Sequence, residues 1–461
     1  MTADPVHLLV THLLSIVGFA MAVVVIAVIV VQRRAPGTTF AWLLAIVLIP
    51  YIGVPLYLLF GGRKVAAKGT KQRLYAPVPE LEKEDTFAGM LCASGAPPPR
   101  ADNSFELYTT GESAFTAIIE TLETAQKSIH ISTLILGDDA VGDAVLGVLE
   151  AKARAGIEVC VLLDSLFKRR SGRKPLRNLL AAGGKVAWFM PVWHLPFRRQ
   201  LRANLRLHRK IIVVDGTTAI VGGMNLALEY MGPKPLPGRW RDLSAKVRGT
   251  AVGDIDAVFR ADWKFAAHEE LAGSAASDEP GPAGQARLQT VGSGPDVADD
   301  LIYDAFITAV FAARRRLWIA TPYFVPDEAL SRALVLACRR GVDVRVVVPA
   351  RSNHRTADYA GASYLRAVAA AGGRVCCFLP TMLHAKAILV DETIAAIGSA
   401  NLDMRSLFLN FEIALFATSP AEVAALAAWF DSLWSDCGEL PPAGRARVLV
   451  ESVARLVGPL E

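Results

Sequence analysis

The pattern His-x-Lys-x4-Asp occurs twice in this 461-residue chain, and the repetition constrains the fold more than any other feature. Two asparagines, Asn225 and Asn401, keep the same separation of 176 residues as the two motifs. Two copies in matching surroundings indicate a duplicated unit, and we expect both halves to build one active site. The motif residues are His208, Lys210 and Asp215 in the first half, and His384, Lys386 and Asp391 in the second.

Each motif includes a short apolar run rich in β-branched residues, Ile211–Val214 in the first half and Ala387–Val390 in the second. Such runs are typical of buried strands. Because side chains two residues apart on a strand share a face, we expect His208 and Lys210 to point the same way. This pair suits a phosphate, since lysine is a point-charge phosphate binder and histidine can act as nucleophile or proton donor near pH 7.

A metal site is not expected at the motifs. Lysine is no ordinary ligand for a divalent metal, and neither a His-x-x-x-His nor a Cys-x-x-Cys pattern accompanies the motifs. The six cysteines show no disulfide framework, so we expect reduced thiols. The sequence therefore predicts no metal and no cofactor.

With its double motif the chain resembles the phospholipase D superfamily, and further segments resemble bacterial cardiolipin synthases. The resemblance covers nearly the whole chain. It implies two phospholipase D-like α/β/α domains with pseudo-twofold symmetry, whose motifs meet at the domain interface. The segments that carry it are Val221–Asn225, Trp240–Asp242, Thr321–Pro326, Met382–Asp391, Gly398–Ser406 and Asn410–Glu412.

The resemblance also implies a reaction, the joining of two phosphatidylglycerol molecules into cardiolipin with release of glycerol through a phosphohistidine. We take His208 as the nucleophile and His384 as the general acid and base, although the sequence allows the reverse. The remaining predicted roles are phosphate binding by Lys210, Lys386, Asn225, Ser399 and Asn401, and orientation of the imidazoles by Asp242 and Glu412.

Two features qualify the motif pattern. Asp215 and Asp391 complete the two motifs, and we expect them to tie each strand end to a turn. Gly223 stands where the second half has Ser399, so the first half supplies one hydroxyl fewer.

Alternating strand and helix patterns predict an α/β fold with a mixed sheet. The first half carries 13 extra residues just before His208, in a stretch (192–207) that mixes Trp193 and Phe197 with four arginines. We interpret that stretch as a lid or lipid-entry element. The predicted boundaries are a membrane hairpin in residues 1–68, a linker in 69–102, a first domain in 103–273, a linker in 274–298 and a second domain in 299–461.

The N-terminal region predicts a transmembrane helical hairpin. Residues 13–31 and 40–60 contain no charged side chain, and each run is about long enough to span a bilayer. We place the two helices at about residues 10–31 and 40–60. Pro50 and Pro55 should kink the second helix, so a re-entrant or shallow hairpin remains open.

Basic residues indicate the orientation of this hairpin. Five of them follow the second apolar run, which places the catalytic part on the cytoplasmic side of a bacterial inner membrane in a multi-pass protein. The five residues are Arg63, Lys64, Lys68, Lys71 and Arg73. Basic residues also cluster within residues 168–177 and 198–206, and an anionic membrane surface would attract these clusters, although a solvated face is the ordinary interpretation of such runs.

Functions other than cardiolipin synthesis are compatible with some of these sequence features. A phospholipase D hydrolase would need the same side chains with water as acceptor, and a related synthase could use phosphatidylethanolamine as donor. A nuclease of the superfamily rarely needs two apolar N-terminal segments, so no nucleic-acid partner is expected. A non-enzymatic scaffold would be expected to lose a motif His or Lys, yet all four are present. The oligomeric state stays open.

Overall fold

The computed structural model describes residues 18–30, 36–60, 86–168, 173–190, 205–271, 281–297 and 299–457. The chain forms two compact units, one of residues 1–65 with 192–205 and one of residues 66–191 with 206–461. The larger unit holds both sequence motifs. The proposed lid falls mainly on residues 191–204, which lie outside the described residues, as do residues 10–17 and 31 of the predicted hairpin.

The described part of the smaller unit between residues 18 and 60 is helical. Residues 18–30 form one helix, followed by α2 (Pro36–Leu48) and α3 (Pro50–Phe60). The break before Pro50 confirms the predicted kink there, because proline has no N–H and disfavours helical geometry in the residue before it. Pro55, in contrast, lies inside α3 without ending it. No helix within the described ranges is both long and apolar enough to cross a membrane.

The first half of the larger unit begins with α4 (Thr86–Ala93) and contains seven strands. Its elements follow in the order β1 (Arg100–Tyr108), α5 (Gly111–Glu123), β2 (Ser128–Thr133), α6 (Ala140–Arg154), β3 (Glu158–Asp164), η1 (Ser165–Phe167), α7 (Arg173–Ala181), β4 (Lys185–Phe189), β5 (Ile211–Val214), β6 (Thr218–Gly222), β7 (Ser244–Arg248) and α8 (Ala251–Ala267).

The second half repeats this order with short additions. Its elements are β8 (Ala286–Ser293), α9 (Leu301–Ala312), β9 (Arg316–Ala320), β10 (Phe324–Val325), α10 (Glu328–Arg339), β11 (Asp343–Pro349), α11 (Arg355–Ala370), β12 (Arg374–Phe378), β13 (Ala387–Val390), β14 (Ile394–Gly398), β15 (Leu402–Asp403), α12 (Met404–Phe408), β16 (Glu412–Ala417), α13 (Pro420–Asp431), η2 (Trp434–Asp436), β17 (Cys437–Glu439) and α14 (Arg445–Val457).

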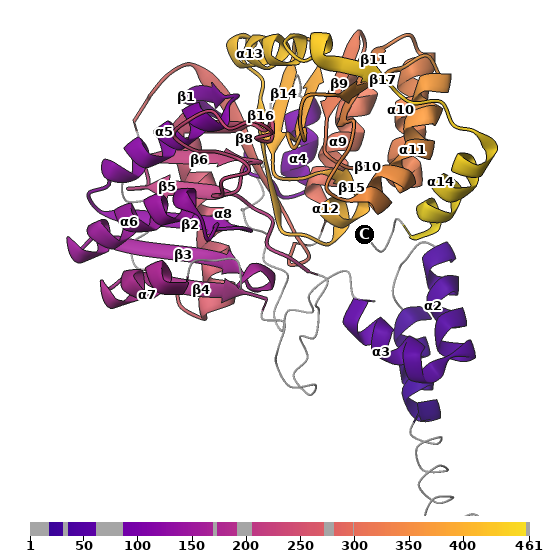
Figure 1. The fold of residues 1–461 in the computed structure, drawn as a ribbon, viewed down its shortest axis with the longest axis horizontal. Coiled ribbons are helices and arrows are strands. Elements are labelled where there is room, and N and C mark those ends of the chain that lie inside the picture. The colour runs from indigo at the N-terminus through magenta and orange to yellow at the C-terminus, as the bar shows by residue number, and fades with distance from the viewer. Residues whose placement is uncertain are drawn as a thin grey trace, which may run out of the picture. The chain divides into compact units, whose positions relative to one another are not determined.

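Both halves contribute to one sheet of 15 strands. From the outside inward the first half reads β4-β3-β2-β5-β6-β7-β1, and the second half, after β17, reads β12-β11-β9-β13-β14-β16-β8. The halves are therefore repeats of one α/β design, and they join where β1 pairs with β8 in antiparallel fashion. Figure 1 shows the magenta and the orange strand sets meeting there.

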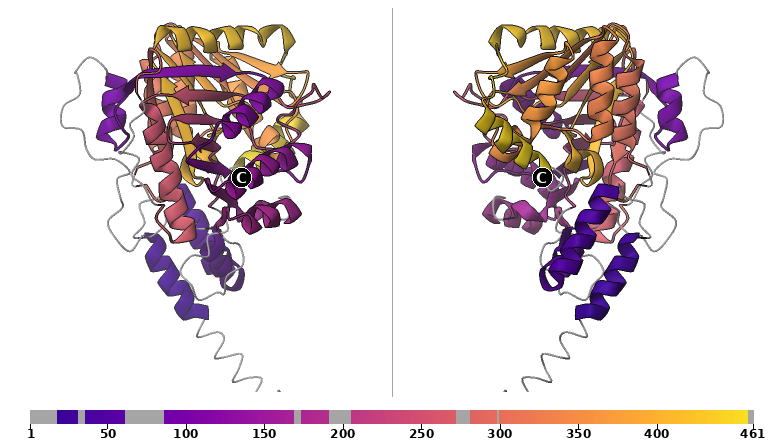
Figure 2. Two further views of the ribbon diagram at one scale, coloured as in Figure 1. Left: turned by 90° about the vertical axis from the view of Figure 1, so that its left-hand side faces the viewer. Right: turned by 90° about the vertical axis from the view of Figure 1, so that its right-hand side faces the viewer.

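Helices cover both faces of the sheet, and each half has its own apolar core. In the first half α8 packs on one face, while α5 and α6 build the core on the other with residues such as Ile129 and Ile131 of β2. The left view of Figure 2 shows this half of the sheet between α8 and the purple helices. The corresponding core of the second half is built around α9 and α10.

Two predictions about local structure are corrected here. The stretch 274–298 contains β8, which pairs with β1 and β16, so residues 286–293 are part of the sheet and not a linker. The prolines and glycines of this stretch indicated a linker, but they lie mostly on either side of the strand. The apolar runs Ile211–Val214 and Ala387–Val390 are strands as predicted, but each motif His and Lys lies in the chain just before its strand.

Candidate active site

The chain segments that carry the two histidines cross between the halves. Leu207 forms a parallel bridge with Phe411, and the amide of His208 donates to the Phe411 carbonyl at 2.9 Å. The second half mirrors this, because Leu383 bridges Arg241 and the amide of His384 donates to the Arg241 carbonyl at 2.7 Å. Each histidine is thus held by backbone of the other half, which explains why it precedes its own strand.

The same crossing sets the carboxylate partner of each imidazole. Nδ1 of His208 lies 2.9 Å from the carboxylate of Glu412, and Nδ1 of His384 lies 2.6 Å from Asp242. Glu412 follows Phe411 and Asp242 follows Arg241, so the bridged residue sits directly before the carboxylate. Because a carboxylate oxygen accepts, each Nδ1 donates its hydrogen, and Nε2 of each ring keeps the lone pair.

Burial favours the neutral form of both imidazoles. Burial lowers the pKa of His208 to about 4, with Lys210 adding to the effect and Glu412 opposing it. Burial and the nearby Lys386 also hold the pKa of His384 well below its usual value.

The rings of Tyr230 and Trp240 pack against His384 at centroid distances of 5.1 and 5.3 Å.

The two carboxylates differ in ionisation. Burial alone would raise the pKa of Glu412, but His208, Lys210 and the Ser399 hydroxyl outweigh burial and hold that pKa below its usual value. Burial raises the pKa of Asp242 to about 7 against the opposing effect of Lys386. His208 therefore has an ionised partner, whereas the partner of His384 titrates near neutrality.

Each motif lysine donates to the backbone of its own motif histidine. Lys210 donates to the backbone carbonyl of His208 at 2.6 Å, and Lys386 donates to the corresponding carbonyl of His384. Nζ of Lys386 also lies 2.6 Å from Nδ1 and 3.2 Å from Nε2 of His384. Burial lowers the pKa of Lys210 to about 7 and that of Lys386 to about 8. An anion in the site would stabilise both ammonium groups.

The Gly223 and Ser399 difference has a geometric cause. Ser399 donates to Glu412 at 2.5 Å and accepts from the Ile413 amide, so its hydroxyl supports the carboxylate and is not directed at a phosphate. At Gly223 the carboxylate of Asp242 fills the equivalent space, and an added Cβ would lie 2.3 Å from its Oδ1. The first half thus replaces a serine and a glutamate by a glycine and an aspartate.

This packing predicts a strong effect of Gly223→Ala. The methyl group would displace Asp242, which is fixed by His384 and the Leu243 amide. We expect kcat to fall by about 100-fold, as for a small misplacement of a catalytic group. The free energy of unfolding should drop by about 1–3 kcal/mol through overpacking. Steady-state rates and urea unfolding measure the two effects.

Gly147→Ala is the matched control, because Gly147 lies in the middle of α6 with no atom within 4 Å of an added Cβ. It should stabilise the protein by about 0.4–1 kcal/mol and leave the rate unchanged. Equal losses in both variants would show that the contact with Asp242 is unimportant.

A cavity of about 660 Å³ opens over the two histidines. His208, His384, Asn225 and Asn401 all line it, so the structure brings together both rings and both asparagines. The Oδ1 atom of Asn225 accepts from the Ile135 amide at 3.3 Å, which fixes this side chain at the wall. Oδ1 of Asn401 has no hydrogen-bond partner among the described residues.

The motif aspartates lie at the far end of each motif strand. Asp215 accepts from the amides of Gln126, Lys127 and Ser128, which lead into β2. Asp391 accepts in the same way from the amides that lead into β9. Both aspartates have positive φ values of 54° and 48°, which an Asp tolerates in a tight turn. These contacts fit the structural role expected for the pair.

Two arginines of the cavity wall were not assigned to the site from the sequence: Arg206 was counted only among the arginines of the proposed lid, and Arg405 was given no role. Arg206 precedes His208 by two residues and donates to Asp164 at 3.4 Å and to the Met190 carbonyl at 3.2 Å. Arg405 lies in α12, where burial lowers its pKa and Asp403 opposes the shift. Their short sequence distance from His208 and Asn401 was the signal available for finding them.

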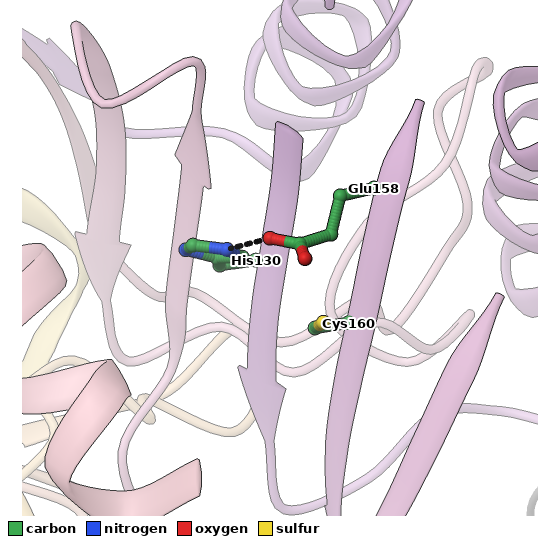
Figure 3. Close-up of side chains that lie close together, drawn as sticks. All are labelled: His130, Glu158 and Cys160. Atoms are coloured by element: carbon green, nitrogen blue, oxygen red, sulfur yellow. Dashed lines mark hydrogen bonds and ion pairs between the residues drawn. The ribbon is translucent and has the colours of Figure 1, made fainter. Parts of the chain in front are cut away.

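One group of three potential metal ligands occurs among the described residues, away from the cavity lining. His130, Glu158 and Cys160 lie on β2 and β3 with their ligand atoms within 4.8 Å of one another (Figure 3). Nδ1 of His130 is 2.7 Å from Asp256, and Nε2 is 3.5 Å from Glu158. Burial lowers the pKa of His130, but the two carboxylates outweigh burial and raise it overall. The His130 ring thus lies between two carboxylates, which favour its protonated form.

A family model described as "Cardiolipin synthase, PLD-like domain" matches residues 118–232 and 306–434. A second, "Phospholipase_D-nuclease N-terminal", matches residues 20–62. The chain is 35% identical to the "Major cardiolipin synthase ClsA" of Bacillus subtilis, over 88% of each chain. It is 33% identical to "Cardiolipin synthase A" of Pseudomonas aeruginosa, over 97% of this chain and 94% of the relative.

A solved structure is similar in fold. The phosphatidylserine synthase of Haemophilus influenzae matches 82% of this chain and 100% of its own length, with a TM-score of 0.59 and 15% identity. At that identity the likeness concerns the arrangement of strands and helices alone.

Proposed function

The chain belongs to the cardiolipin synthase family with phospholipase D-like domains, and from this premise we propose that it joins two phosphatidylglycerol molecules into cardiolipin and glycerol. It is a phosphatidyltransferase of the phospholipase D type. The observation that carries the proposal is the pair of imidazoles in one cavity, each fixed through Nδ1 by a carboxylate of the other half.

The first step attaches the phosphatidyl group to His208. Nε2 of His208 attacks phosphorus of the donor lipid, and the bond between phosphorus and the glycerol head group breaks. His384 gives a proton to the departing glycerol oxygen. Arrival of the anionic phosphodiester raises the pKa of His384 and prepares this proton. The product of this step is a phosphatidyl-His208 and free glycerol.

The second step returns the group to a lipid alcohol. A head-group hydroxyl of a second phosphatidylglycerol gives its proton to His384, and its oxygen attacks phosphorus. The bond between phosphorus and Nε2 of His208 breaks, which releases cardiolipin and restores both imidazoles. We assign stabilisation of the charge on the non-bridging oxygens in both steps to Asn225 and Asn401, which line the cavity, and to Lys210 and Lys386.

The choice of His208 as nucleophile is supported by its partner. Glu412 accepts from Ser399 and Asn410 as well as from His208, and these donors favour its ionised form. An ionised carboxylate stabilises the positive charge that develops on an attacking imidazole. Asp242, with a pKa raised to about 7, offers less of this stabilisation to His384.

We further propose that the N-terminal unit is a membrane hairpin of about residues 10–31 and 40–60 in a bacterial inner membrane, with the catalytic halves in the cytoplasm. The described helices α2 and α3 contain no charged residue. The basic residues after residue 62 favour this orientation. A re-entrant or shallow hairpin, which does not cross the membrane fully, is the alternative that the break at Pro50 supports.

Product analysis tests the reaction. The purified chain is incubated in mixed micelles with phosphatidylglycerol as the only phospholipid, and products are separated by mass spectrometry. We expect cardiolipin and glycerol in equal amounts. Phosphatidic acid as the main product would identify a hydrolase instead. Release of ethanolamine on addition of phosphatidylethanolamine would identify the alternative donor.

The lysines predict a pH dependence of anion binding. Burial lowers the pKa of Lys210 to about 7 and that of Lys386 to about 8, so both ammonium groups lose their protons as the pH rises through these values. Inhibition by glycerophosphoglycerol, a phosphodiester that does not titrate in this range, should weaken by up to about tenfold per pH unit for each lysine. The measurement is the inhibition constant from pH 6 to 9.

Lys210→Met provides the comparison for this titration. It should weaken inhibition at low pH and remove one of the two titrating groups from the profile. An inhibition constant that does not change with pH in the wild-type protein would show that neither lysine holds the phosphate.

A further inference from the structure

The helix α14 at the end of the described chain buries one charged side chain, Glu451, against α11. Glu451 is only 2% exposed and accepts from Nε and Nη2 of Arg366 in α11, both at 3.0 Å. Arg447, one turn earlier, donates to the same carboxylate at 2.9 Å. The bidentate ion pair between Arg366 and Glu451 fixes the rotation of α14 about its axis. Figure 1 shows α11 and α14 side by side.

The opposite side of α14 is apolar and faces away from the protein. Leu449 is 66% exposed, Val453 58% and Val450 49%. With Ala446 these side chains fall within an arc of about 100° on the helix. An amphipathic helix ordinarily buries such a stripe against its own core. A contiguous exposed stripe therefore indicates a surface that something else covers.

The charges of α14 limit what can cover it. Arg445, Arg447 and Arg455 oppose one acid, Glu451, along these 13 residues. A second copy of α14 would bring the same arginines toward one another. The uncharged N-terminal apolar segments would offer the arginines no counter-charge. An anionic lipid surface supplies both an apolar phase and negative head groups, which is the environment preferred by a basic amphipathic helix.

We propose that α14 is an interfacial helix that inserts Leu449, Val450 and Val453 into the surface of a membrane rich in anionic lipid. The proposal rests on the proposed function only for the identity of that membrane, the one that holds the substrate. α11 connects this surface to the active site, because Thr356 and Ala357 at its N-terminal end line the catalytic cavity. Binding of α14 to the membrane would therefore set the orientation of the catalytic cavity relative to the lipid surface.

A depth measurement on the full-length protein tests this assignment. Leu449→Cys and, separately, Val453→Cys are labelled with an environment-sensitive fluorophore in a background in which the half-exposed Cys376 and Cys437 are serine. The protein is reconstituted into phosphatidylglycerol vesicles with and without brominated acyl chains. We expect brominated lipid to quench both labels several-fold more than a label at Leu336→Cys, an exposed leucine on α10.

Equal quenching at positions 449 and 336 would overturn the proposal. So would shielding of the Leu449→Cys label that grows with protein concentration in lipid-free detergent, because it would assign the stripe to a second copy. Shielding in detergent that is independent of concentration would assign the stripe to another segment of the same chain. None of these readings depends on turnover, so a failure here is distinguishable from a failure of the cardiolipin assay.

Discussion

Replacing His208 with alanine should reduce cardiolipin formation by roughly 10⁴-fold or more, the loss expected when a covalent nucleophile is removed. His384→Ala should reduce it by about 10²–10⁴-fold, the range for general acid–base catalysis. Both rings line the same cavity, and the proposed steps require both. The measurement is the initial rate of cardiolipin formation from phosphatidylglycerol in mixed micelles.

The control for these variants is His268→Ala. His268 is exposed at the end of α8, outside the cavity lining, and its loss should leave the rate close to that of the wild-type protein. Circular dichroism should show that all three variants are folded. Retained synthesis in either motif variant would contradict the assigned chemistry.

Glu412→Gln should slow the reaction by about 10²–10⁴-fold, as when the carboxylate behind a catalytic histidine becomes an amide. His208, Ser399 and Asn410 all donate to Glu412. A glutamine has one acceptor oxygen where the glutamate has two, and it lacks the negative charge that stabilises the attacking imidazole. The rate and the pH profile of the variant report this loss.

Glu392→Gln is the matched control, because Glu392 is half exposed and pairs with arginines on the surface. Its rate should stay close to wild type, since exposed ion pairs contribute little. The crossing makes the test specific: Glu412 belongs to the second half and yet serves the histidine of the first. A Glu412→Gln enzyme with a normal rate would show that this carboxylate does not position His208.

The repeated halves could be predicted from the sequence because their signals are local. The runs Ile211–Val214 and Ala387–Val390 are strands as their composition indicates. The equal spacing of the motifs also indicated a duplication. The two halves have the same strand order, which confirms it. The break at Pro50 follows from proline chemistry alone.

The crossing of the two halves could not be predicted, because it depends on pairing between distant segments. Nothing near His208 in the sequence indicates that Phe411 is its backbone partner, or that Glu412 rather than Asp242 receives its Nδ1 hydrogen. The role of Ser399 was missed for the same reason, since its partner Glu412 is brought close only by the fold. The rotation of α14 depends on Arg366, which lies 85 residues before Glu451.

Trapping the covalent intermediate tests the central claim most directly. The protein is mixed with phosphatidylglycerol carrying a phosphorus label, quenched in denaturing detergent at neutral pH during turnover, and digested for mass spectrometry. The account predicts an acid-labile phosphatidyl group on the peptide that contains His208, accumulating when acceptor lipid is scarce. Cardiolipin formed at the normal rate with no label on that peptide would contradict it.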